Sequence, residues 1–293
     1  MSLPTRLLHG WRFCLAVLFF LLAQILAATL GGIFFDPKAS RLAFEAAFRP
    51  LALLFLLMLF GLLAKFFDRP PQPLLAGQGI PLSSGWKRDL GLGAALGFAM
   101  ISLCVAVIAV FGQYSFAAQS VPDLLPHLAL VLWIGITAAT LEEIAFRGYP
   151  FMTLIKAIGR WPAAIAMSLL FAAGHLLNPH WTYLGFANTA LVGLLLSLSF
   201  LRTGALWMAI GIHFAWNIAL GTLYGLLVSG VDLFAAGIKG SAAGHPWLTG
   251  GNYGVEASLT GSFSILLGLA VLLLATRPKK IAAPQNPEPD LSL

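Results

Sequence analysis

Apolar segments of about twenty residues recur along most of the chain and leave few ways for it to fold. Each has roughly the 20 residues that an α-helix needs to cross the hydrocarbon core of a bilayer. Free backbone N–H and C=O groups find no partner in lipid, so such segments must be helical. We therefore predict an all-α polytopic membrane protein, a bundle of about eight transmembrane helices. The predicted spans are 13–35, 50–67, 90–112, 129–154, 161–178, 183–201, 205–229 and 258–276.

The composition excludes several other classes of protein. Of the 293 residues, 59% are hydrophobic and 10% are charged, whereas an average globular chain has about 25% charged residues. The net charge of +6 lies in connections and termini, with no basic cluster interleaved with aromatic residues, so no nucleic-acid partner is expected. Cys14 and Cys104 both lie in apolar spans, which argues against a disulfide framework. The lipid bilayer is the expected environment.

The domain organisation predicted from the sequence is simple. We expect a single transmembrane domain over residues 1–278 and a Pro-rich, polar, disordered tail at 279–293. The connection from 69 to 88 is rich in Pro and Gly and is predicted to be a loop. The connection at 230–257 is Gly-rich, and its role stays open between a flexible link and a lid or docking segment.

Lys and Arg residues predict how the spans are oriented. Thirteen of the seventeen lie at the N-terminus, in the second, fourth and sixth connections, or at the C-terminus. The other four are Lys38, Arg41, Arg49 and Lys239. Because cytoplasmic connections carry an excess of Lys and Arg, both termini are predicted to be cytoplasmic.

Two adjacent carboxylates, Glu142 and Glu143, lie within the apolar segment that begins near Leu128. A charged side chain at mid-bilayer costs about 2.5–3.5 kcal/mol on insertion scales, so such residues usually serve a function. Glu143 precedes Arg147 by four residues on the same helical face and is its expected ion-pair partner. Glu142 points about 100° away, lacks that partner and is expected to face a cavity.

Two histidines and an asparagine lie well inside other apolar spans. His175 ends the segment that begins at Phe171, and His213 precedes Asn217 by four residues, which places those two side chains on one helix face. A lone His in a membrane span also occurs as a structural strut between helices. If the fourth span continues to about residue 154, Glu142 lies at a depth similar to that of both imidazoles, and a polar cavity inside the bundle is the better interpretation.

Seven residues on three predicted spans form an ordered pattern. It consists of Glu142-Glu143 with Arg147, Phe171 with His175, and His213 with Asn217. This pattern resembles the CAAX prenyl protease and bacteriocin-processing family of intramembrane glutamic endopeptidases, over a motif region of about 125–220. The stretch from Gly250 to Glu256 is similar to a segment of some bacterial relatives.

The resemblance implies a fold and an activity. It implies an eight-helix endopeptidase whose cavity opens to the cytoplasm and whose substrate is a peptide or a membrane-associated protein. The short chain and its likeness to bacterial relatives lead us to expect the plasma (inner) membrane of a bacterium. Neither the sequence nor the resemblance indicates an oligomeric state.

The resemblance also implies roles for these side chains, and their chemistry suits those roles. Glu142 would take a proton from the water that attacks the scissile carbonyl, and His175 would position the same water. His213 and Asn217 would donate hydrogen bonds to the oxyanion of the tetrahedral intermediate. Structural support is implied for Glu143, Arg147 and Phe171.

A mechanism without metal or other cofactor is the favoured expectation. The alternative is Zn²⁺, with Glu142, His175 and His213 filling three tetrahedral positions and water the fourth. The spacing differs, however, from that of familiar zinc proteases, which place two His residues on one helical face.

Two other classes of function stay open. One is a catalytically silent membrane scaffold or bacteriocin self-immunity factor, against which the filled catalytic positions argue. The other is a proton- or ion-coupled transporter, because intramembrane Glu, His and Arg also mark ion paths. The chain shows no inverted repeat of the kind that many secondary transporters carry, which makes transport the weaker of the two.

Overall fold

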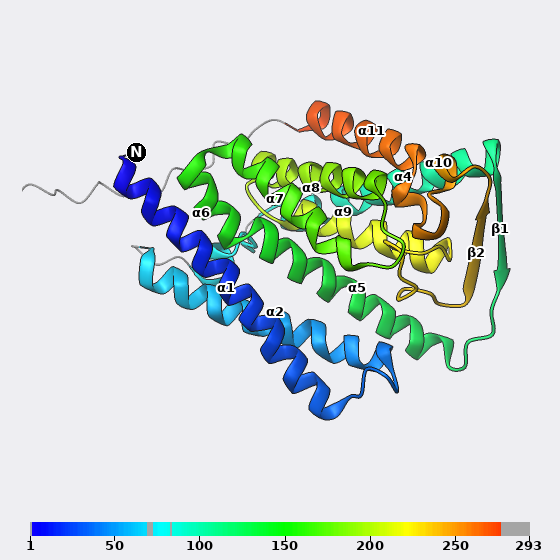
Figure 1. The fold of residues 1–293 in the computed structure, drawn as a ribbon, viewed down its shortest axis with the longest axis horizontal. Coiled ribbons are helices and arrows are strands. Elements are labelled where there is room, and N and C mark those ends of the chain that lie inside the picture. The colour runs from blue at the N-terminus through cyan, green and yellow to red at the C-terminus, as the bar shows by residue number, and fades with distance from the viewer. Residues whose placement is uncertain (1, 69–72, 83, 277–293) are drawn as a thin grey trace, which may run out of the picture.

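The computed structural model describes residues 2–68, 73–82 and 84–276, to which all structural statements refer. The tail predicted at 279–293 and part of the connection predicted at 69–88 lie outside the described residues. The described chain is mostly helical, as predicted (Figure 1). The α-helices are α1 (Leu3–Phe34), α2 (Arg41–Phe67), α3 (Leu74–Gly77), α4 (Trp86–Phe111), α5 (Leu124–Arg147), α6 (Tyr149–Ile158), α7 (Arg160–Gly174), α8 (Tyr183–Thr203), α9 (Trp207–Ile218), α10 (Pro246–Thr249) and α11 (Leu259–Ala275).

Short turns and two strands complete the fold. The strands are β1 (Gln113–Ala118) and β2 (Ile238–Ala243). The turns are the 3₁₀ turns η1 (His175–Leu177), η3 (Gly251–Tyr253) and η4 (Val255–Ala257), and the π-helical turn η2 (Ala219–Leu223).

The predicted spans agree with the helices in number. Among the described residues, six helical segments are long and apolar enough to cross a membrane, and α5 with α6 counts as one of them. Two shorter apolar segments, Trp207–Leu223 and Leu259–Ala275, correspond to the seventh and eighth predicted spans. The protein is therefore a multi-pass membrane protein.

Three predicted boundaries differ from the structure by more than five residues. The first span was predicted to begin at 13, but α1 begins at Leu3. The second span was predicted to begin at 50, but α2 begins at Arg41. Glu45 and Arg49 in its first turns pair with each other, and Arg49 also pairs with Glu142, so these charges do not end the helix. The seventh span was predicted to reach 229, but the helix ends at Ile218 and η2 at Leu223. Beyond it, Gly225 has a positive φ of 62° and turns the chain back, so that the N–H of Leu226 donates to the carbonyl of Leu220.

The fourth predicted span is interrupted at Gly148. α5 ends at Arg147 and α6 begins at Tyr149, with a change of direction that is plain in Figure 1. A side chain at Gly148 would meet the carbonyl oxygens of Ile144 and Gln78, so the close approach requires glycine. The span continues past Arg147, as the depth argument predicts, and Arg147 is fully buried.

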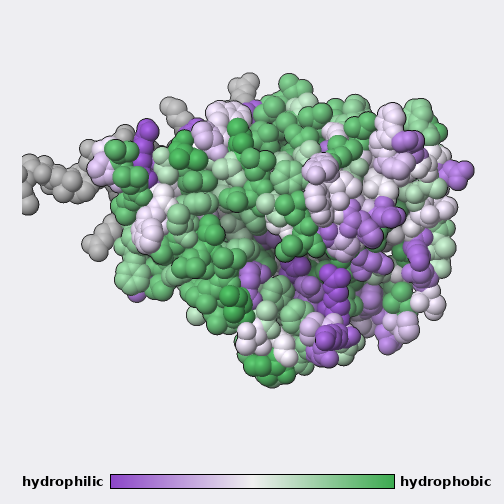
Figure 2. All heavy atoms as spheres, in the orientation of Figure 1, coloured by the Kyte–Doolittle hydropathy of each residue, from purple (hydrophilic) through white to green (hydrophobic). Residues whose placement is uncertain are grey.

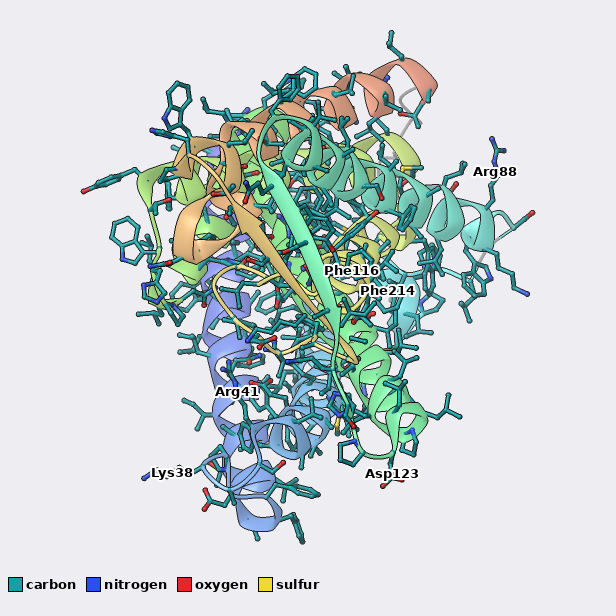
Figure 3. All side chains as sticks on the ribbon, turned by 90° about the vertical axis from the view of Figure 1, so that its right-hand side faces the viewer. Lys38, Arg41, Arg88, Phe116, Asp123 and Phe214 are labelled. Carbon is teal, nitrogen blue, oxygen red and sulfur yellow. The ribbon has the colours of Figure 1, made fainter. Side chains whose placement is uncertain are left out.

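The two strands lie where the sequence predicts only loops. β1 and β2 pair antiparallel, with Gln113 opposite Ala243 and Ala118 opposite Ile238. Figure 3 looks onto this end of the molecule and shows the two strands crossing in front of the helices. Two connections far apart in the sequence thus satisfy their backbone groups through each other.

The two ends of the bundle are distinct and are called the terminal end and the hairpin end. The terminal end carries the start of α1, the end of α11 and the connections α2–α4, α6–α7 and α8–α9. The hairpin end carries the connections 35–40, 112–123, 178–182 and 224–258, which include β1 and β2. In Figure 1 the terminal end is at the left and the hairpin end at the right.

α4 packs closely along α9 because glycines remove the side chains at their contact. Gly93 and Gly97 of α4 lie against the backbone of Met208 and Ile212, and Gly211 of α9 lies against that of Leu90. Small residues at a helix interface allow this approach, which lets dispersion forces hold membrane helices together. The contact places α9, which carries His213 and Asn217, at the centre of the bundle.

We expect Gly97→Leu to lower the free energy of unfolding by about 1–3 kcal/mol or more, the usual cost of overpacking. The reason is that its side chain would collide with the backbone of Ile212. Gly91→Leu is the matched control, since Gly91 lies on the same helix with no atom near its Cβ position. The unfolding midpoint in a denaturing-detergent titration measures both, and equal midpoints would contradict the packing argument.

Candidate active site

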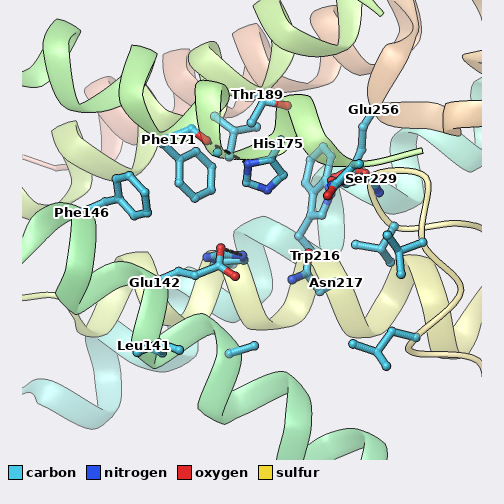
Figure 4. A pocket seen from close by; sticks show the side chains of 18 of the residues that line it. Leu141, Glu142, Phe146, Phe171, His175, Thr189, Trp216, Asn217, Ser229 and Glu256 are labelled. Atoms are coloured by element: carbon cyan, nitrogen blue, oxygen red, sulfur yellow. Dashed lines mark hydrogen bonds and ion pairs between the residues drawn. The ribbon is translucent and has the colours of Figure 1, made fainter. Parts of the chain in front are cut away.

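A pocket of about 550 Å³ lies inside the bundle. Side chains of α1, α2, α5, α7, α8 and α9 line it, together with residues of the connection between η2 and α11. The four side chains predicted to carry chemistry all line this pocket: Glu142, His175, His213 and Asn217 (Figure 4). The structure therefore brings together an acid, two imidazoles and an amide from α5, η1 and α9.

Glu142 faces the pocket from α5, with 26% of its side chain exposed. Its Oε2 atom lies 3.7 Å from Nε2 of His213. Arg147 pairs with Glu143 rather than with Glu142, as predicted, but Oε1 of Glu142 lies 3.5 Å from a terminal nitrogen of Arg49, a partner that the sequence did not predict. Arg49 reaches it from α2 and also donates to Glu45 at 2.7 Å, so spacing along α5 alone gave no sign of it.

Glu143 and Arg147 form the ion pair that their spacing predicts. Arg147 donates to Oε1 of Glu143 at 3.1 Å, and both side chains are completely buried. The guanidinium also donates to the carbonyl of Gly193 on α8 and stacks on Phe171, with 4.3 Å between its central carbon and the ring centroid. The pair thus ties α5 to α7 and α8 beside the pocket.

His213 connects the two glutamates. Its Nδ1 atom lies 2.9 Å from Oε1 of Glu143, and because a carboxylate accepts, Nδ1 carries the hydrogen of this bond. Nε2 is then directed toward Glu142, and the edge of the ring packs against Phe171. Glu143 therefore holds His213 in one orientation as well as pairing with Arg147, a contact between helices that the sequence did not predict.

His175 is held in a similar way. α7 ends at Gly174, and His175 begins η1, where its Nδ1 atom donates to the carbonyl of Phe171 at 2.8 Å. A neutral ring bonded in this way has its lone pair on Nε2. The ring packs on that of Phe171, with 4.8 Å between centroids, and Figure 4 shows it across the pocket from Glu142.

Asn217 lies one helical turn beyond His213 on α9 and lines the same pocket. The side chain is largely buried, with 9% of the residue exposed. Its amide makes no hydrogen bond to another described residue, so both donor hydrogens stay available to a molecule in the pocket.

Several other polar residues line the pocket and were not predicted to belong to the site, among them Arg49, Gln24 and Glu256. Gln24 of α1 has a buried amide nitrogen without a hydrogen-bond partner among the described residues. Glu256 accepts from the indole of Trp216 at 2.9 Å and from the backbone and hydroxyl of Ser229. It thereby joins the connection after η2 to α9. The sequence signal for Glu256 was its place in the Gly-rich stretch that follows Gly250.

The metal alternative can be tested against the positions of its three predicted ligands. Nε2 of His213 lies near Glu142, but the described residues contain no group of three His, Cys, Asp or Glu side chains arranged to hold a metal ion. Glu142, His175 and His213 thus do not form a ready-made three-ligand group in this arrangement.

The pocket lies toward the hairpin end. Its lining includes Arg41 from the first turn of α2 and residues from connections of that end, namely Asn178, Val228, Ser229, Val231, Leu233, Phe234 and Glu256. No described lining residue belongs to a connection of the terminal end. The described lining therefore lies nearer the hairpin end than the terminal end.

The comparisons with known proteins agree with the motifs. The family model described as type II CAAX prenyl endopeptidase Rce1-like matches residues 124–219, about a third of the chain, and this segment contains all seven motif residues. The match confirms the resemblance and supports a CAAX-type intramembrane protease. Comparisons with curated proteins and with solved structures gave no match.

Proposed function

We propose that the protein is an intramembrane endopeptidase that hydrolyses a peptide bond with water activated by Glu142. The observation that carries the proposal is the pocket itself, in which Glu142 lies 3.7 Å from His213 and shares the wall with His175 and Asn217. This arrangement supplies a base, a second group for the water and two donors for an oxyanion, which are the requirements of amide hydrolysis.

The first step is the attack of water on the scissile carbonyl carbon. Glu142 accepts a proton from the water as the new C–O bond forms. The lone pair on Nε2 of His175 accepts the other hydrogen of the water and directs its oxygen toward the carbonyl. Both groups act from opposite walls of the pocket, so the peptide lies between them (Figure 4). Positioning of this kind replaces the random encounter of water and amide in solution.

The second requirement is stabilisation of the negative oxygen of the tetrahedral intermediate. The amide of Asn217 donates one hydrogen bond. His213 donates another through Nε2, which requires the doubly protonated ring because Nδ1 already donates to Glu143. Two carboxylates, Glu142 and Glu143, lie beside the ring and balance this charge. The intermediate collapses as the C–N bond breaks, and Glu142 returns its proton to the departing amine.

We propose that the chemistry is carried by these side chains alone, without a metal. The three candidate ligands do not form a metal-binding group in the described residues, which supports this choice. Metal analysis of active protein after washing with a chelator tests it. Activity that disappears with the metal and returns on adding Zn²⁺ would overturn the proposal.

The substrate is proposed to be a peptide or a small membrane-associated protein. The test compares the protein termini in membranes that contain the wild-type chain with those that contain Glu142→Ala. A new terminus that appears only with the wild-type chain identifies the substrate, and the purified protein should then cleave a peptide of that sequence. A scaffold, an immunity factor or a transporter would produce no such terminus. If repeated comparisons reveal no new terminus, the endopeptidase proposal is refuted.

Asn217→Ala should reduce kcat by about 10²–10³-fold, the typical cost of removing one oxyanion donor. KM should change little, because the oxyanion forms only in the transition state. Asn252→Ala is the matched control, since Asn252 is exposed at the hairpin end and does not line the pocket. A rise in KM with unchanged kcat would instead assign Asn217 to binding of the ground-state peptide.

A further inference from the structure

The side of the membrane from which the pocket is reached follows from three observations. The first is where its lining comes from. The connections 178–182 and 224–258 and the first turn of α2 supply lining residues, and all three lie at the hairpin end. Leu177, at the rim beside His175, is 94% exposed. Figure 2 shows hydrophilic side chains gathered toward this end and around a hollow near the centre.

The second observation is that the terminal end is closed. A buried apolar cluster fills the bundle between the pocket and the terminal end. Its members include Tyr149, Phe151, Leu154, Met167, Phe200 and Leu206. Phe171 and the fully buried Arg147 lie between this cluster and the pocket. A peptide therefore has no open route to Glu142 from the terminal end among the described residues.

The third observation is the distribution of positive charge. Of the Lys and Arg residues that the structure describes, nine lie at the terminal end or in spans next to it, against four at the hairpin end. Arg147 is buried in an ion pair and Arg49 is bound to Glu45 and Glu142, so neither counts toward the excess of positive charge that marks the cytoplasmic side. Among the described residues the excess is then eight against three, or seven against three when Arg12, which pairs with Asp68, is also left out. This excess places the terminal end in the cytoplasm.

We propose that the active site is reached from the non-cytoplasmic side of the membrane, and that its substrates are exported or outward-facing membrane-bound peptides. The proposal rests on the proposed function for its substrate class, but its claim about sidedness does not. It excludes chains that present a scissile bond from the cytoplasm.

The wall at α1 indicates how such a peptide is held. α1 packs mainly against α2 and α6, and its residues Phe20, Leu21 and Gln24 form part of the pocket wall. Gln24 lies there with a buried amide nitrogen that has no partner, and leaving such a donor unpaired is costly. The carbonyl of a peptide bound in the pocket would satisfy it.

Labelling of single cysteines in intact cells tests the sidedness. In a background with Cys14→Ser and Cys104→Ala, Leu177→Cys reports the rim of the pocket and Ser84→Cys reports the terminal end. A membrane-impermeant thiol reagent should label Leu177→Cys in intact cells and Ser84→Cys only after permeabilisation. The reverse pattern would overturn the proposal. A reporter fused after Lys280 that is active only outside the cytoplasm would do the same.

A second measurement separates this proposal from the proposed function. The substrate peptide, added outside intact cells, should be cleaved by the wild-type chain and not by Glu142→Gln. Cleavage only in inverted vesicles would overturn the sidedness while leaving the endopeptidase in place. Outward labelling at Leu177→Cys without hydrolysis of any candidate peptide would support the sidedness and count against the endopeptidase.

Discussion

Glu142→Gln is expected to slow peptide hydrolysis by about 10²–10⁴-fold, the usual contribution of a positioned general base. Glutamine keeps the size and shape of the side chain, and its amide can still approach His213 and Arg49. It cannot take the proton of the attacking water. Because Glu142 is the partly exposed member of the glutamate pair and lines the pocket, the substitution should leave the fold intact.

The measurement is the cleavage rate of the peptide identified from the membrane comparison, with purified protein in detergent. Asp232→Asn makes the same change of charge at an exposed position outside the pocket and should cleave at the wild-type rate. Equal unfolding midpoints of the two variants show that any loss of activity is chemical. A Glu142→Gln protein that retains the wild-type rate would remove Glu142 from the mechanism.

The helices were predictable from the sequence because the length of an apolar segment is a local property. The errors occurred where distant parts of the chain decide the outcome. The first turns of α2 contain Arg41, Glu45 and Arg49, which in sequence look like the polar end of a span. In the structure Arg49 pairs inside the bundle, so the helix begins nine residues earlier than predicted. The pairing of β1 with β2 joins connections more than a hundred residues apart and left no local pattern.

In the site, too, contacts along one helix were predictable from the sequence and contacts between helices were not. The pair Glu143–Arg147 and the shared face of His213 and Asn217 follow from helical spacing, and both are present. The contact of His213 with Glu143 crosses between α9 and α5, and periodicity along one helix cannot reveal it. Glu256 was also missed as a pocket residue, because a glycine-rich connection does not show in which direction its acidic side chains point.

The expected side of the cavity and the expected side of the termini can be compared only once the fold is known. The resemblance and the charge pattern each gave an expectation about the cytoplasm, one for the cavity and one for the termini. Only the structure shows that the cavity lies toward the end of the bundle opposite to the start of α1 and the end of α11. The charge pattern belongs to this chain, whereas the cavity's direction was carried over from the family, so we give the charges precedence.

Arg147→Met is expected to lower the free energy of unfolding by about 3–5 kcal/mol, the cost of removing one partner of a buried ion pair. The carboxylate of Glu143 would then be left fully buried with His213 as its only hydrogen-bond partner. One of its oxygens already has no hydrogen-bond partner among the described residues, so no alternative donor is at hand. Arg88→Met, at an exposed position at the start of α4, is the control and should unfold like the wild type.

The double variant Glu143→Leu/Arg147→Met separates stability from activity. Replacing both partners of a buried pair by apolar groups of similar volume is often nearly neutral, so most of the lost stability should return. The rate of peptide cleavage should stay low, because Nδ1 of His213 has lost the acceptor that orients its ring. Denaturing-detergent titration and the cleavage assay on the same samples measure the two effects. Recovery of both together would mean that Glu143 serves the fold alone, and that His213 needs no carboxylate to hold it.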